Sequence, residues 1–368
     1  MPYQSNIEKW KDEMMERKDI TVLALESSCD DTAAAVVRNG RQILSMCADS
    51  QIEEHRKFGG VVPEVAARSH LKSMDDVVDR ALEEGKVSFD DIDLIAVTCG
   101  PGLIGPLLSA VSCGKALALS RNIPLVGVHH IKGHIAASYL QRKDWEPPFI
   151  ALVISGGHSH IAIVEDYDVV RWLGRTRDDS AGEAFDKVAR VLGLPYPGGP
   201  EIDRIARAGD PNAIRYPVAK VKDAPLDMSF SGLKTAVIQS VESGLKENTA
   251  QIQSNARFVE SVRGHSREDI AASFQHAVIK ALSQRALKAM EQTGIMKLAI
   301  VGGVASNSAL RGRMQELSKA EGFDLCVPAP ILCTDNAAMI GAAGYYAARA
   351  GKLHDMSLNA YAVLDISW

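Results

Sequence analysis

Two histidines, His130 and His134, stand four residues apart where the predicted secondary structure changes. Residues 124–128 before them have the apolar character of a strand, and residues 135–140 after them have that of a helix. On a helix, side chains at i and i+4 share a face, so both imidazoles could bind one metal ion. The chain holds ten histidines, however, so one such pair arises easily by chance. A metal site would need a third ligand.

The histidine pair also excludes one class of enzyme. A metalloprotease of the H-E-x-x-H type needs a glutamate directly after the first histidine as its general base, and that position holds Ile131. Peptidase chemistry is therefore poorly supported. Asp335, which precedes a predicted helix over residues 337–348, leaves two interpretations open. It caps that helix, or it is an oxygen ligand that completes a metal site with open positions for a substrate.

Two glycine turns have the composition of phosphate-binding loops. Residues 155–157, Ser-Gly-Gly, join two predicted strands, and their N–H groups could approach a phosphate closely, although an ordinary hairpin turn is the alternative. Residues 302–303, Gly-Gly, follow a strand and precede a helix that is predicted to begin near residue 306 or 307. They could bind an anion or a flat base, although an ordinary strand-to-helix turn is the alternative. Asn307 has a donor and an acceptor suited to a nucleotide, and it is also a good helix cap.

Three carboxylates lie near a third glycine turn. Glu183 and Asp186 share one face of a predicted helix, and Asp203 follows the turn at residues 198–199. With Pro200 opening the next helix, Asp203 is predicted in its first turn. Carboxylates near glycine turns suit ribose hydroxyls, but a negative charge in a first turn is also favoured by the helix dipole alone.

The bulk composition indicates a two-domain globular protein. A chain of 368 residues exceeds the usual single hydrophobic core. With 46% hydrophobic and 24% charged residues, it has no apolar run near the about 18 residues of a membrane span. Residues 1–18 are polar and lack the apolar core of a signal peptide, so we expect a cytoplasmic protein with no membrane contact.

The cysteines and the net charge indicate the state of the thiols and the kind of binding partner. The six cysteines are scattered without a C-x-x-C pair, which favours reduced thiols. The net charge of −5 argues against a protein that coats nucleic acid, although a local basic patch could serve one RNA substrate. A solvated surface is the alternative interpretation of the basic residues in question, which are Arg204, Arg207, Arg215, Lys220, Lys222, Arg257, Arg263 and Arg267.

The order of predicted elements indicates an internal duplication. Three antiparallel strands open the chain, and alternating helices and strands follow, and the same pattern then returns. The predicted strands of the first half are residues 21–25, 32–37, 42–47, 93–98 and 124–128, and those of the second are 148–154, 158–164, 168–173, 297–301 and 324–327. Long helices are predicted over residues 62–84 and 267–293.

This pattern predicts an α/β fold of two lobes with mixed sheets and a ligand cleft between them. We expect the N-terminal lobe to span residues 1–143, with residues 345–368 returning to it, and the C-terminal lobe to span residues 144–344. Residues 175–264, approximately, have no counterpart in the first half and form an insertion in the second lobe. Insertions of this size usually carry specificity.

Nine ordered motifs make the chain resemble the tRNA N6-adenosine threonylcarbamoyltransferase family, called TsaD in bacteria. The resemblance runs from about residue 22 to about residue 345. The motifs are LESSCDDT (25–32), FGGVVPE (58–64), GPGLIGP (100–106), HIKGH (130–134), ISGG (154–157), AGEAFDK (181–187), YPGGP (196–200), SFSGLKT (229–235) and GGVASN (302–307). Lys132 departs from the family pattern, which often has an acidic residue between the histidines.

The resemblance implies the duplicated, ribonuclease H-like fold of the actin-like ATPases and a site for each reactant. It implies transfer of a threonylcarbamoyl group from threonylcarbamoyl-AMP to N6 of adenosine 37 in tRNAs that read ANN codons, giving N6-threonylcarbamoyladenosine. The implied ligands of one divalent metal per subunit, Fe²⁺ or Zn²⁺, are His130, His134 and Asp335. The implied site for threonylcarbamoyl-AMP or an adenine nucleotide comprises Val153, Ile154, Ser155, Gly156, Gly157, Asp186, Gly199, Asp203 and Asn307.

The expected mechanism needs positioning more than proton transfer. With the metal polarising the carbamoyl carbonyl, the adenosine amine would attack and the phosphate would leave. Glu26 and Asp30 are weak candidates for a general base, and no catalytic side chain is assigned. The resemblance further implies three partners, namely tRNA, a small paralogous protein of related fold (TsaB) and an ATPase (TsaE). A kinase-like phosphotransferase or an ATP-binding subunit of the same fold is the competing interpretation.

Overall fold

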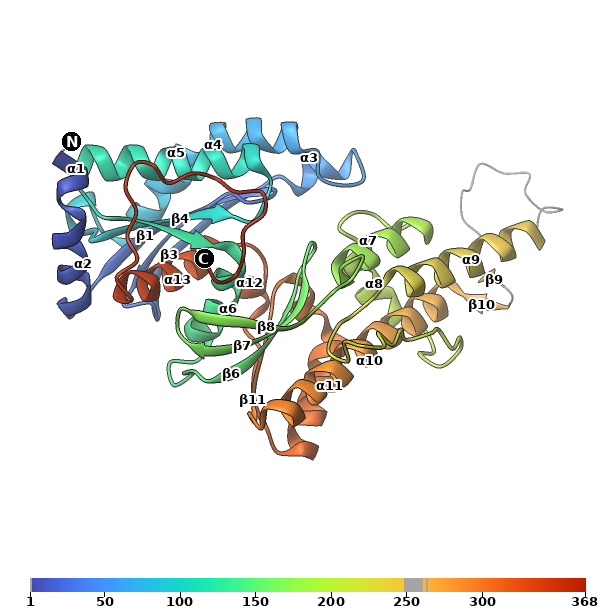
Figure 1. The fold of residues 1–368 in the computed structure, drawn as a ribbon. Coiled ribbons are helices and arrows are strands. Elements are labelled where there is room, and N and C mark those ends of the chain that lie inside the picture. Colours follow the sequence, from blue (N-terminus) through green and yellow to red (C-terminus); the bar gives the residue numbers. More distant parts are fainter. Residues whose placement is uncertain (1, 248–260, 263) are drawn as a thin grey trace. The chain divides into compact units, whose positions relative to one another are not determined.

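The computed structural model describes residues 2–247, 261–262 and 264–368 (Figure 1). The chain divides into two compact units. Unit 1 consists of Met1–Phe149, Val164–Arg171 and Cys326–Trp368, and unit 2 consists of Ile150–Ile163 and Trp172–Leu325.

The sheet of unit 1 contains the three antiparallel strands that the sequence predicts. Strand β1 is antiparallel to β2 and parallel to β4, which pairs in parallel with β5. Asn39 and Gly40 both have positive φ at the β2–β3 turn, a conformation that suits a tight hairpin. The strand order is β3-β2-β1-β4-β5, and the bounds are β1 (Thr21–Glu26), β2 (Asp31–Arg38), β3 (Gln42–Ser50), β4 (Leu94–Gly100) and β5 (Leu125–His129).

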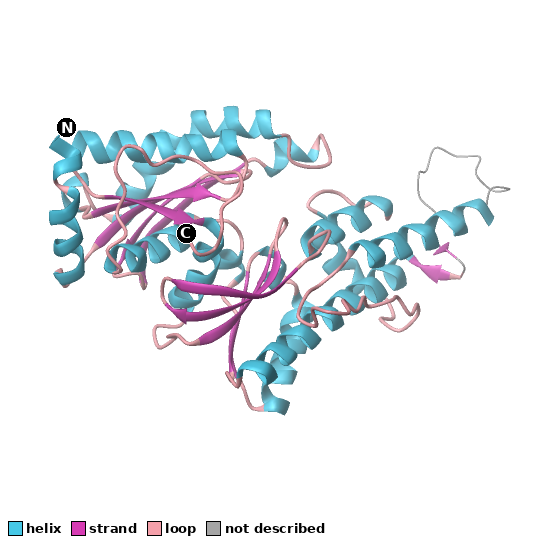
Figure 2. Cartoon of the chain, in the orientation of Figure 1, coloured by secondary structure: helices cyan, strands magenta, loops and turns pink. Residues whose placement is uncertain are grey.

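Helices cover both faces of this sheet, so that every residue of β1 is buried (Figure 2). One hydrophobic core joins alternate residues of β1 to α4 (Pro63–Gly85) and α5 (Ile104–Arg121). A second core joins the other residues of β1 to α13 (Ala337–Arg349), which also packs against α6 (His130–Gln141). The short helices of this unit are α3 (Ile52–Arg56), η1 (Phe89–Asp91) and α12 (Pro330–Cys333).

The polar leader is an integral part of unit 1. It forms α1 (Pro2–Ser5) and α2 (Ile7–Glu16), which bury three side chains, those of Tyr3, Trp10 and Met14. Arg349 donates hydrogen bonds to the carbonyl oxygens of Met14 at 3.1 Å and Arg17 at 2.9 Å. The leader therefore contributes to the core, which its polar composition did not reveal.

The second sheet repeats the first. Its strand order is β12-β11-β6-β7-β8, and β6 pairs in parallel with β11, as β1 does with β4. The bounds are β6 (Phe149–Ile154), β7 (Ser159–Asp166), β8 (Val169–Arg175), β11 (Lys297–Val301) and β12 (Asp324–Cys326). Read as β8-β7-β6-β11-β12, this order corresponds strand by strand to the first sheet, which confirms the predicted duplication.

The other elements of unit 2 are mostly helical. They are α7 (Ala181–Val191), α8 (Gly198–Ala206), α9 (Ser231–Glu247), β9 (Ser261–Val262), β10 (His265–Ser266), α10 (Arg267–Thr293), η3 (Gly303–Ser306) and α11 (Ser308–Glu321). Helix α10 has the bounds that its apolar periodicity predicts. Among the described residues, no helix combines the length and the apolar character that a membrane crossing requires.

Helix α8 corrects one expectation. It begins at Gly198, two residues before Pro200, so Asp203 lies beyond the first turn and not within it. The helix dipole therefore does not account for this carboxylate. Two of the basic residues considered above, Arg257 and Arg263, lie outside the described part of the chain.

Candidate metal centre and nucleotide site

Helix α6 begins directly at the end of β5, and His129 forms its N-cap. The Nδ1 atom of His129 accepts a hydrogen bond from the backbone N–H of Ile131 at 3.1 Å, and its Nε2 donates to the carbonyl oxygen of Leu364 at 3.2 Å. Burial lowers the pKa of His129 to about 4, so the ring is neutral at pH 7. Both ring nitrogens are used, and His129 is a structural cap.

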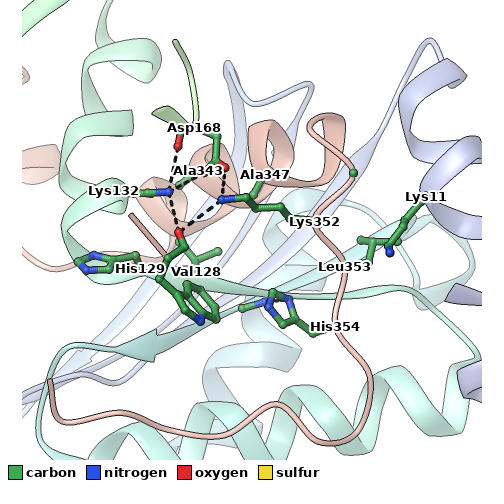
Figure 3. A pocket seen from close by; sticks show the side chains of 13 residues that line it. Lys11, Val128, His129, Lys132, Asp168, Ala343, Ala347, Lys352, Leu353 and His354 are labelled. Carbon is green, nitrogen blue, oxygen red and sulfur yellow. Dashed lines mark hydrogen bonds and ion pairs between the residues drawn. The ribbon is translucent and has the colours of Figure 1, made fainter. Parts of the chain in front are cut away.

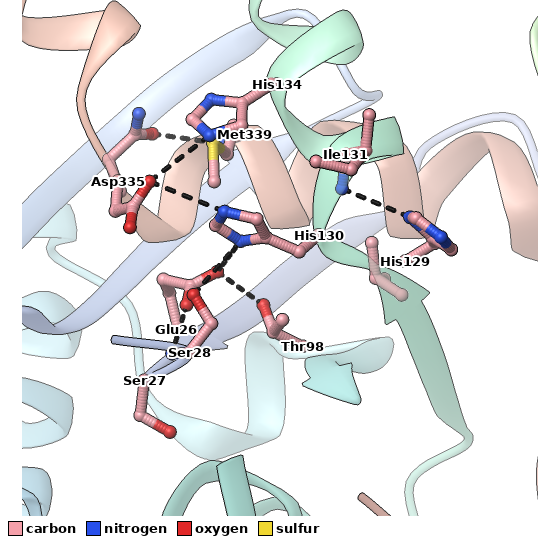
Figure 4. Close-up of polar contacts among 12 residues, drawn as sticks. Glu26, Ser27, Ser28, Thr98, His129, His130, Ile131, His134, Asp335 and Met339 are labelled. Atoms are coloured by element: carbon pink, nitrogen blue, oxygen red, sulfur yellow. Dashed lines mark hydrogen bonds and ion pairs between the residues drawn. The ribbon is translucent and has the colours of Figure 1, made fainter. Parts of the chain in front are cut away.

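His130 and His134 point to the same carboxylate (Figure 4). The Nε2 atom of His130 lies 3.5 Å from Oδ1 of Asp335, and the Nε2 atom of His134 lies 3.2 Å from it. Asp335 precedes α13, which packs against α6. The structure thus brings together the three residues that the sequence predicts as metal ligands, with their ligand atoms within 4.8 Å of one another.

The donor set suits a metal ion. Nitrogen and oxygen ligands about 2.0–2.1 Å from a tetrahedral ion lie about 3.4 Å apart, close to the two separations from Asp335. His134 is fully buried, and within the described residues neither of its ring nitrogens makes a hydrogen bond, although Nε2 faces Asp335. A buried imidazole is rarely left in this state. A cation between the three side chains would give Nε2 of His134 a partner.

Asp335 does not cap α13. The N-cap is Asn336, whose Oδ1 accepts a hydrogen bond from the backbone N–H of Met339 at 2.9 Å. The capping interpretation of Asp335 is therefore wrong, because the neighbouring amide takes that role. The carboxylate of Asp335 is left to face the two histidines.

Glu26 lies on the other side of His130. It is the last residue of β1, and its side chain is fully buried. Its carboxylate accepts hydrogen bonds from the backbone N–H of Ser28 at 2.5 Å and from the hydroxyl of Thr98 at 2.6 Å, and Oε2 lies 3.2 Å from Nδ1 of His130. Because it has no access to solvent, Glu26 does not suit the role of a general base that reaches a substrate.

The electrostatics of the centre favour positive charge. Burial alone would lower the pKa of His130, but the carboxylates of Asp335 and Glu26 outweigh it and raise that pKa to about 9. Burial alone would raise the pKa of Glu26, but the charge of His130 lowers it. Burial also raises the pKa of Asp30, and it raises the pKa of Asp31 to about 7.

Lys132 lies between the two histidines in sequence, and helical spacing places it on the opposite side of α6 from them. Figure 3 shows the contacts of its ammonium group. Its ammonium donates to the carbonyl oxygen of Asp168 at 3.0 Å, to Oδ1 of Asp168 at 2.9 Å and to the carbonyl oxygen of Trp368 at 2.9 Å. These bonds use all three of its protons. A pocket of about 300 Å³ adjoins this ammonium group. The three hydrogen bonds of Lys132 leave it no proton to donate to a ligand in that pocket.

The turn at residues 155–157 in unit 2 leaves room for a ligand. The N–H of Ser155 donates to the carbonyl oxygen of His158 at 2.8 Å, which closes the hairpin. A Cβ atom added at Gly156 or Gly157 would meet no atom within 4 Å. By contrast, a Cβ atom on Gly182 would lie 2.5 Å from the carbonyl oxygen of Ser155, so the start of α7 touches the turn.

The N-cap of α7 also contacts this turn. Ser180 is the N-cap of α7, and its hydroxyl also donates to the carbonyl oxygen of Gly156. Gly302 has φ of +92°, and a Cβ atom there would lie 2.5 Å from the carbonyl oxygen of Ile154. Both glycine turns therefore lie at the ends of the neighbouring strands β6 and β11, beside a helix N-terminus.

The remaining predicted nucleotide residues occupy defined places in unit 2. Val153 and Ile154 are buried in β6, and Gly199 is open, with no atom within 4 Å of an added Cβ. Asp186 accepts a hydrogen bond at 2.7 Å from the N–H of Gly198, the first residue of α8. This bond fixes the start of α8 against α7 and holds the turn at Gly199.

Two further residues hold the start of α11. Asn307 is its N-cap, accepting from the N–H of Leu310 at 2.9 Å and donating to Gln275 at 2.7 Å. Asp203 accepts from the hydroxyl of Ser308 at 2.9 Å and from its N–H at 3.3 Å. Their side chains are thus already used within the protein, and any role in nucleotide binding is shared with this structural one.

Comparison with known proteins now decides the family. The model of the TsaD family, tRNA N6-adenosine threonylcarbamoyltransferase, matches residues 42–342. The chain belongs to this family. A tRNA N6-adenosine threonylcarbamoyltransferase of Clostridioides difficile (strain 630) is 51% identical over 349 residues, covering 95% of this chain and 99% of the relative. One of Clostridium novyi (strain NT) is 52% identical over 344 residues, covering 93% and 97%.

Solved structures show the fold of this threonylcarbamoyltransferase family member independently. The crystal structure of HypF from T. kodakarensis matches 90% of the chain with a TM-score of 0.60 at 15% identity. A full-length HypF in the phosphate- and nucleotide-bound form matches with a TM-score of 0.58 at 14% identity. The chain spans about half of each HypF chain, 48% and 46%. At this identity the likeness supports the duplicated, actin-like fold alone.

Sequence reasoning missed several residues that surround the candidate site. Ser28 and Thr98 contact Glu26, and Ser28 also lies 3.1 Å from Nδ1 of His130. Ser28 belongs to a motif that carried the resemblance, so its position was a usable signal. Nothing in the sequence around Thr98 or Ser180 distinguishes them from ordinary strand and cap residues.

Proposed function

We propose that this chain catalyses the reaction for which its family is named, with threonylcarbamoyl-AMP as the donor. The acceptor is N6 of adenosine 37 in tRNAs that read ANN codons, and the product is N6-threonylcarbamoyladenosine. The observation that carries the proposal is the convergence of His130, His134 and Asp335 in one cluster, in which both histidines are buried. Membership of the family supplies the reaction class.

In this proposal His130, His134 and Asp335 hold one divalent ion, Fe²⁺ or Zn²⁺, since imidazole and carboxylate suit both. When bound, the ion supplies a Lewis acid for the carbamoyl carbonyl. The protein holds both histidines on α6 and Asp335 directly before α13, which packs against α6, so that little reorganisation is needed.

The donor's adenylate is assigned to unit 2. The N–H groups of Gly156 and Gly157 would bind its phosphate, because the space beside both glycines is open. The start of α7 touches this turn, and the positive end of its dipole favours an anion there. The residues that support this surface are Val153, Ile154, Ser155, Asp186, Gly199, Asp203 and Asn307. In the reaction a bond forms between N6 and the carbamoyl carbon, and the bond from that carbon to the phosphate oxygen breaks. AMP leaves with the electron pair, and N6 loses a proton.

The proposed partners are tRNA and two proteins. Exposed basic residues of unit 2, namely Arg215, Lys220 and Lys222, suit contact with tRNA phosphates. Arg204 and Arg207 are exposed too, but each is paired with a carboxylate of its own helix. A small paralogous partner (TsaB) and an ATPase (TsaE) complete the proposal, and the substrate implies a cytoplasmic reaction.

The test supplies threonylcarbamoyl-AMP and unmodified tRNA to the purified chain together with its partners. Digestion of the tRNA and mass spectrometry should then reveal the modified nucleoside. The double variant His130→Ala, His134→Ala should lose at least about 100-fold in rate and should lose its metal, while His276→Ala, at an exposed position of α10, should keep both.

Two results would contradict the proposal. If no modified nucleoside forms while the chain phosphorylates a small molecule with ATP, the kinase-like interpretation is correct. If the metal content of the double histidine variant equals that of the wild-type protein, the metal assignment is wrong. Anomalous scattering at the zinc and iron edges would identify the ion.

A further inference from the structure

Glu26 is a buried carboxylate for which the proposed reaction has no use. Its side chain is fully buried, whereas a residue that moves a proton on a substrate must reach it. Burying an ionised carboxylate is costly unless several donors compensate it. The structure supplies three such donors, on Ser28, Thr98 and His130. One of these donors belongs to His130, which suggests that Glu26 acts on the metal centre.

The contact between Glu26 and His130 has a defined direction. An ionised carboxylate only accepts hydrogen bonds, so the proton between Oε2 of Glu26 and Nδ1 of His130 belongs to the imidazole. The hydroxyl of Ser28, 3.1 Å from the same Nδ1, is a second acceptor for that proton. With the proton on Nδ1, the lone pair of the neutral ring lies on Nε2, which faces Asp335 at 3.5 Å.

Glu26 is itself held in place. The backbone N–H of Ser28 binds one carboxylate oxygen at 2.5 Å, and the hydroxyl of Thr98 binds the other at 2.6 Å. Thr98 lies on β4, the parallel neighbour of β1. The orientation of the carboxylate is thus set by the turn that follows β1 and by the neighbouring strand β4, before His130 is considered (Figure 4).

We propose that Glu26 is a positioning residue for the metal centre. It accepts the Nδ1 proton of His130 and so fixes the tautomer and the ring orientation that direct Nε2 toward the site shared with His134 and Asp335. Metal-bound histidines commonly donate their second N–H to a carboxylate in this way. The inference rests on the proposed function only in so far as His130, His134 and Asp335 bind a metal.

The two histidine ligands are unequal in this scheme. Within the described residues, Nδ1 of His134 has no hydrogen-bond partner, and its ring is held by burial. Nδ1 of His130 has two partners, Glu26 and Ser28. The effect of changing Glu26 should therefore pass through His130 alone.

The test compares Glu26→Gln with Glu53→Gln, a change at an exposed position of α3. Apparent affinities for Zn²⁺ and Co²⁺ are measured by competition with a chromogenic chelator, and the visible spectrum of the Co²⁺ form reports the ligand geometry. Glutamine has one acceptor oxygen for three donors, so Glu26→Gln should weaken metal binding by about 10- to 100-fold and alter the Co²⁺ spectrum. Glu53→Gln should change neither.

Further variants separate an effect on metal binding from an effect on folding. Glu26→Asp keeps the charge and should recover part of the affinity. Thr98→Val keeps the carboxylate and removes one bond that orients it, so a loss of a few-fold is expected. In the His130→Ala background, Glu26→Gln should cause no further loss of affinity for metal bound by the remaining ligands.

Three outcomes would overturn the inference. The first is a metal affinity of Glu26→Gln within two-fold of wild type, together with a large loss of affinity in His130→Ala. This result would support the metal site and exclude the role of Glu26. Another is a lower melting temperature of metal-free Glu26→Gln and Thr98→Val with unchanged affinity, the mark of a purely structural residue. The third is a lower kcat at unchanged affinity and Co²⁺ spectrum, which would make Glu26 a participant in the reaction. Metal retention by the double histidine variant would instead refute the proposed metal site itself.

Discussion

Lys132 and Asp168 form an ion pair of 2.9 Å in which both side chains are nearly withdrawn from solvent, at 8% and 12% exposure. Lys132 also binds the carbonyl oxygen of Trp368, and the second oxygen of Asp168 binds Lys352. The pair therefore fastens the β7–β8 turn and the last residue of the chain to α6, the helix that carries His130 and His134.

We predict that Lys132→Met lowers the free energy of unfolding by about 2–3 kcal/mol, because it strands a largely buried carboxylate. This loss is smaller than that for a fully unpaired buried charge, because Asp168 keeps its ion pair with Lys352. Lys352→Met, at a side chain with 41% exposure, should cost less than about 1 kcal/mol. Chemical denaturation measures both. A double variant Lys132→Met, Asp168→Asn that loses the full sum of the single losses would show that the pair is not coupled.

Arg41 offers a second test of how unit 1 is held together. Its guanidinium donates to the carbonyl oxygens of Arg142 at 3.1 Å and Trp145 at 2.8 Å and to the hydroxyl of Tyr167 at 3.0 Å. It also lies 5.1 Å from the centre of the Tyr139 ring.

Lysine cannot reproduce this forked set of donors, so Arg41→Lys should lower the free energy of unfolding by about 1–3 kcal/mol. The melting temperature should fall accordingly. Arg68→Lys, at an arginine with 74% exposure on α4, is the matched control and should stay within about 0.5 kcal/mol of wild type. Equal effects at the two positions would show that the contacts of Arg41 contribute nothing measurable.

The close approach of α7 to the β6–β7 turn leads to a prediction for the donor site. A Cβ atom on Gly182 would lie 2.5 Å from the carbonyl oxygen of Ser155 and 2.7 Å from Cα of Gly156. Gly182→Ala should therefore displace the turn and weaken binding of an adenine nucleotide by at least about 10-fold in calorimetry. Its metal content should not change, because the three predicted ligands belong to unit 1.

Gly312 is the control for this substitution. It lies within α11, and an added Cβ atom meets no atom within 4 Å. Gly312→Ala should leave nucleotide affinity unchanged and raise stability by up to about 1 kcal/mol, as expected for a helix interior. Normal nucleotide affinity in Gly182→Ala would disprove the assignment of the phosphate to this turn.

The pH dependence of stability should carry a contribution from His160. Burial, with a smaller effect of Arg175, lowers its pKa to about 4, although Asp227 opposes the shift. Between about pH 6.5 and pH 4 the unfolded chain binds a proton at this histidine that the folded chain does not. The free energy of unfolding therefore falls as the pH falls through this range, by at most about 1.4 kcal/mol per pH unit from this group.

His160→Phe should make this part of the profile shallower, because phenylalanine keeps a ring against Trp172, 4.6 Å away in the native protein, without titrating. Denaturation at pH 7 and pH 5 measures the difference. His276→Ala, at an exposed position, should retain the wild-type slope. A His160→Phe profile parallel to that of the wild type would contradict the prediction.

Local periodicity in the sequence was sufficient to predict much of this protein. Short continuous apolar runs predict the central strands of both sheets, because these strands are buried on both faces. Apolar residues at helical spacing predict α10. The spacing of His130 and His134 places both imidazoles on one face of α6 for the same reason. The resemblance to the family favoured the ligand interpretation of Asp335 over the cap and supplied the reaction class, which spacing does not contain.

The tertiary structure decided everything that depends on contacts between distant segments. Asp335 reaches the histidines only because α13 packs against α6, and Glu26 reaches the back of His130 only because β1 ends beside it. Whether Asp335 or Asn336 caps α13 depends on backbone angles that composition leaves open, since both residues are good caps. The burial of Lys132 likewise follows from the partners that Asp168 and Trp368 provide, which lie 36 and 236 residues away along the chain.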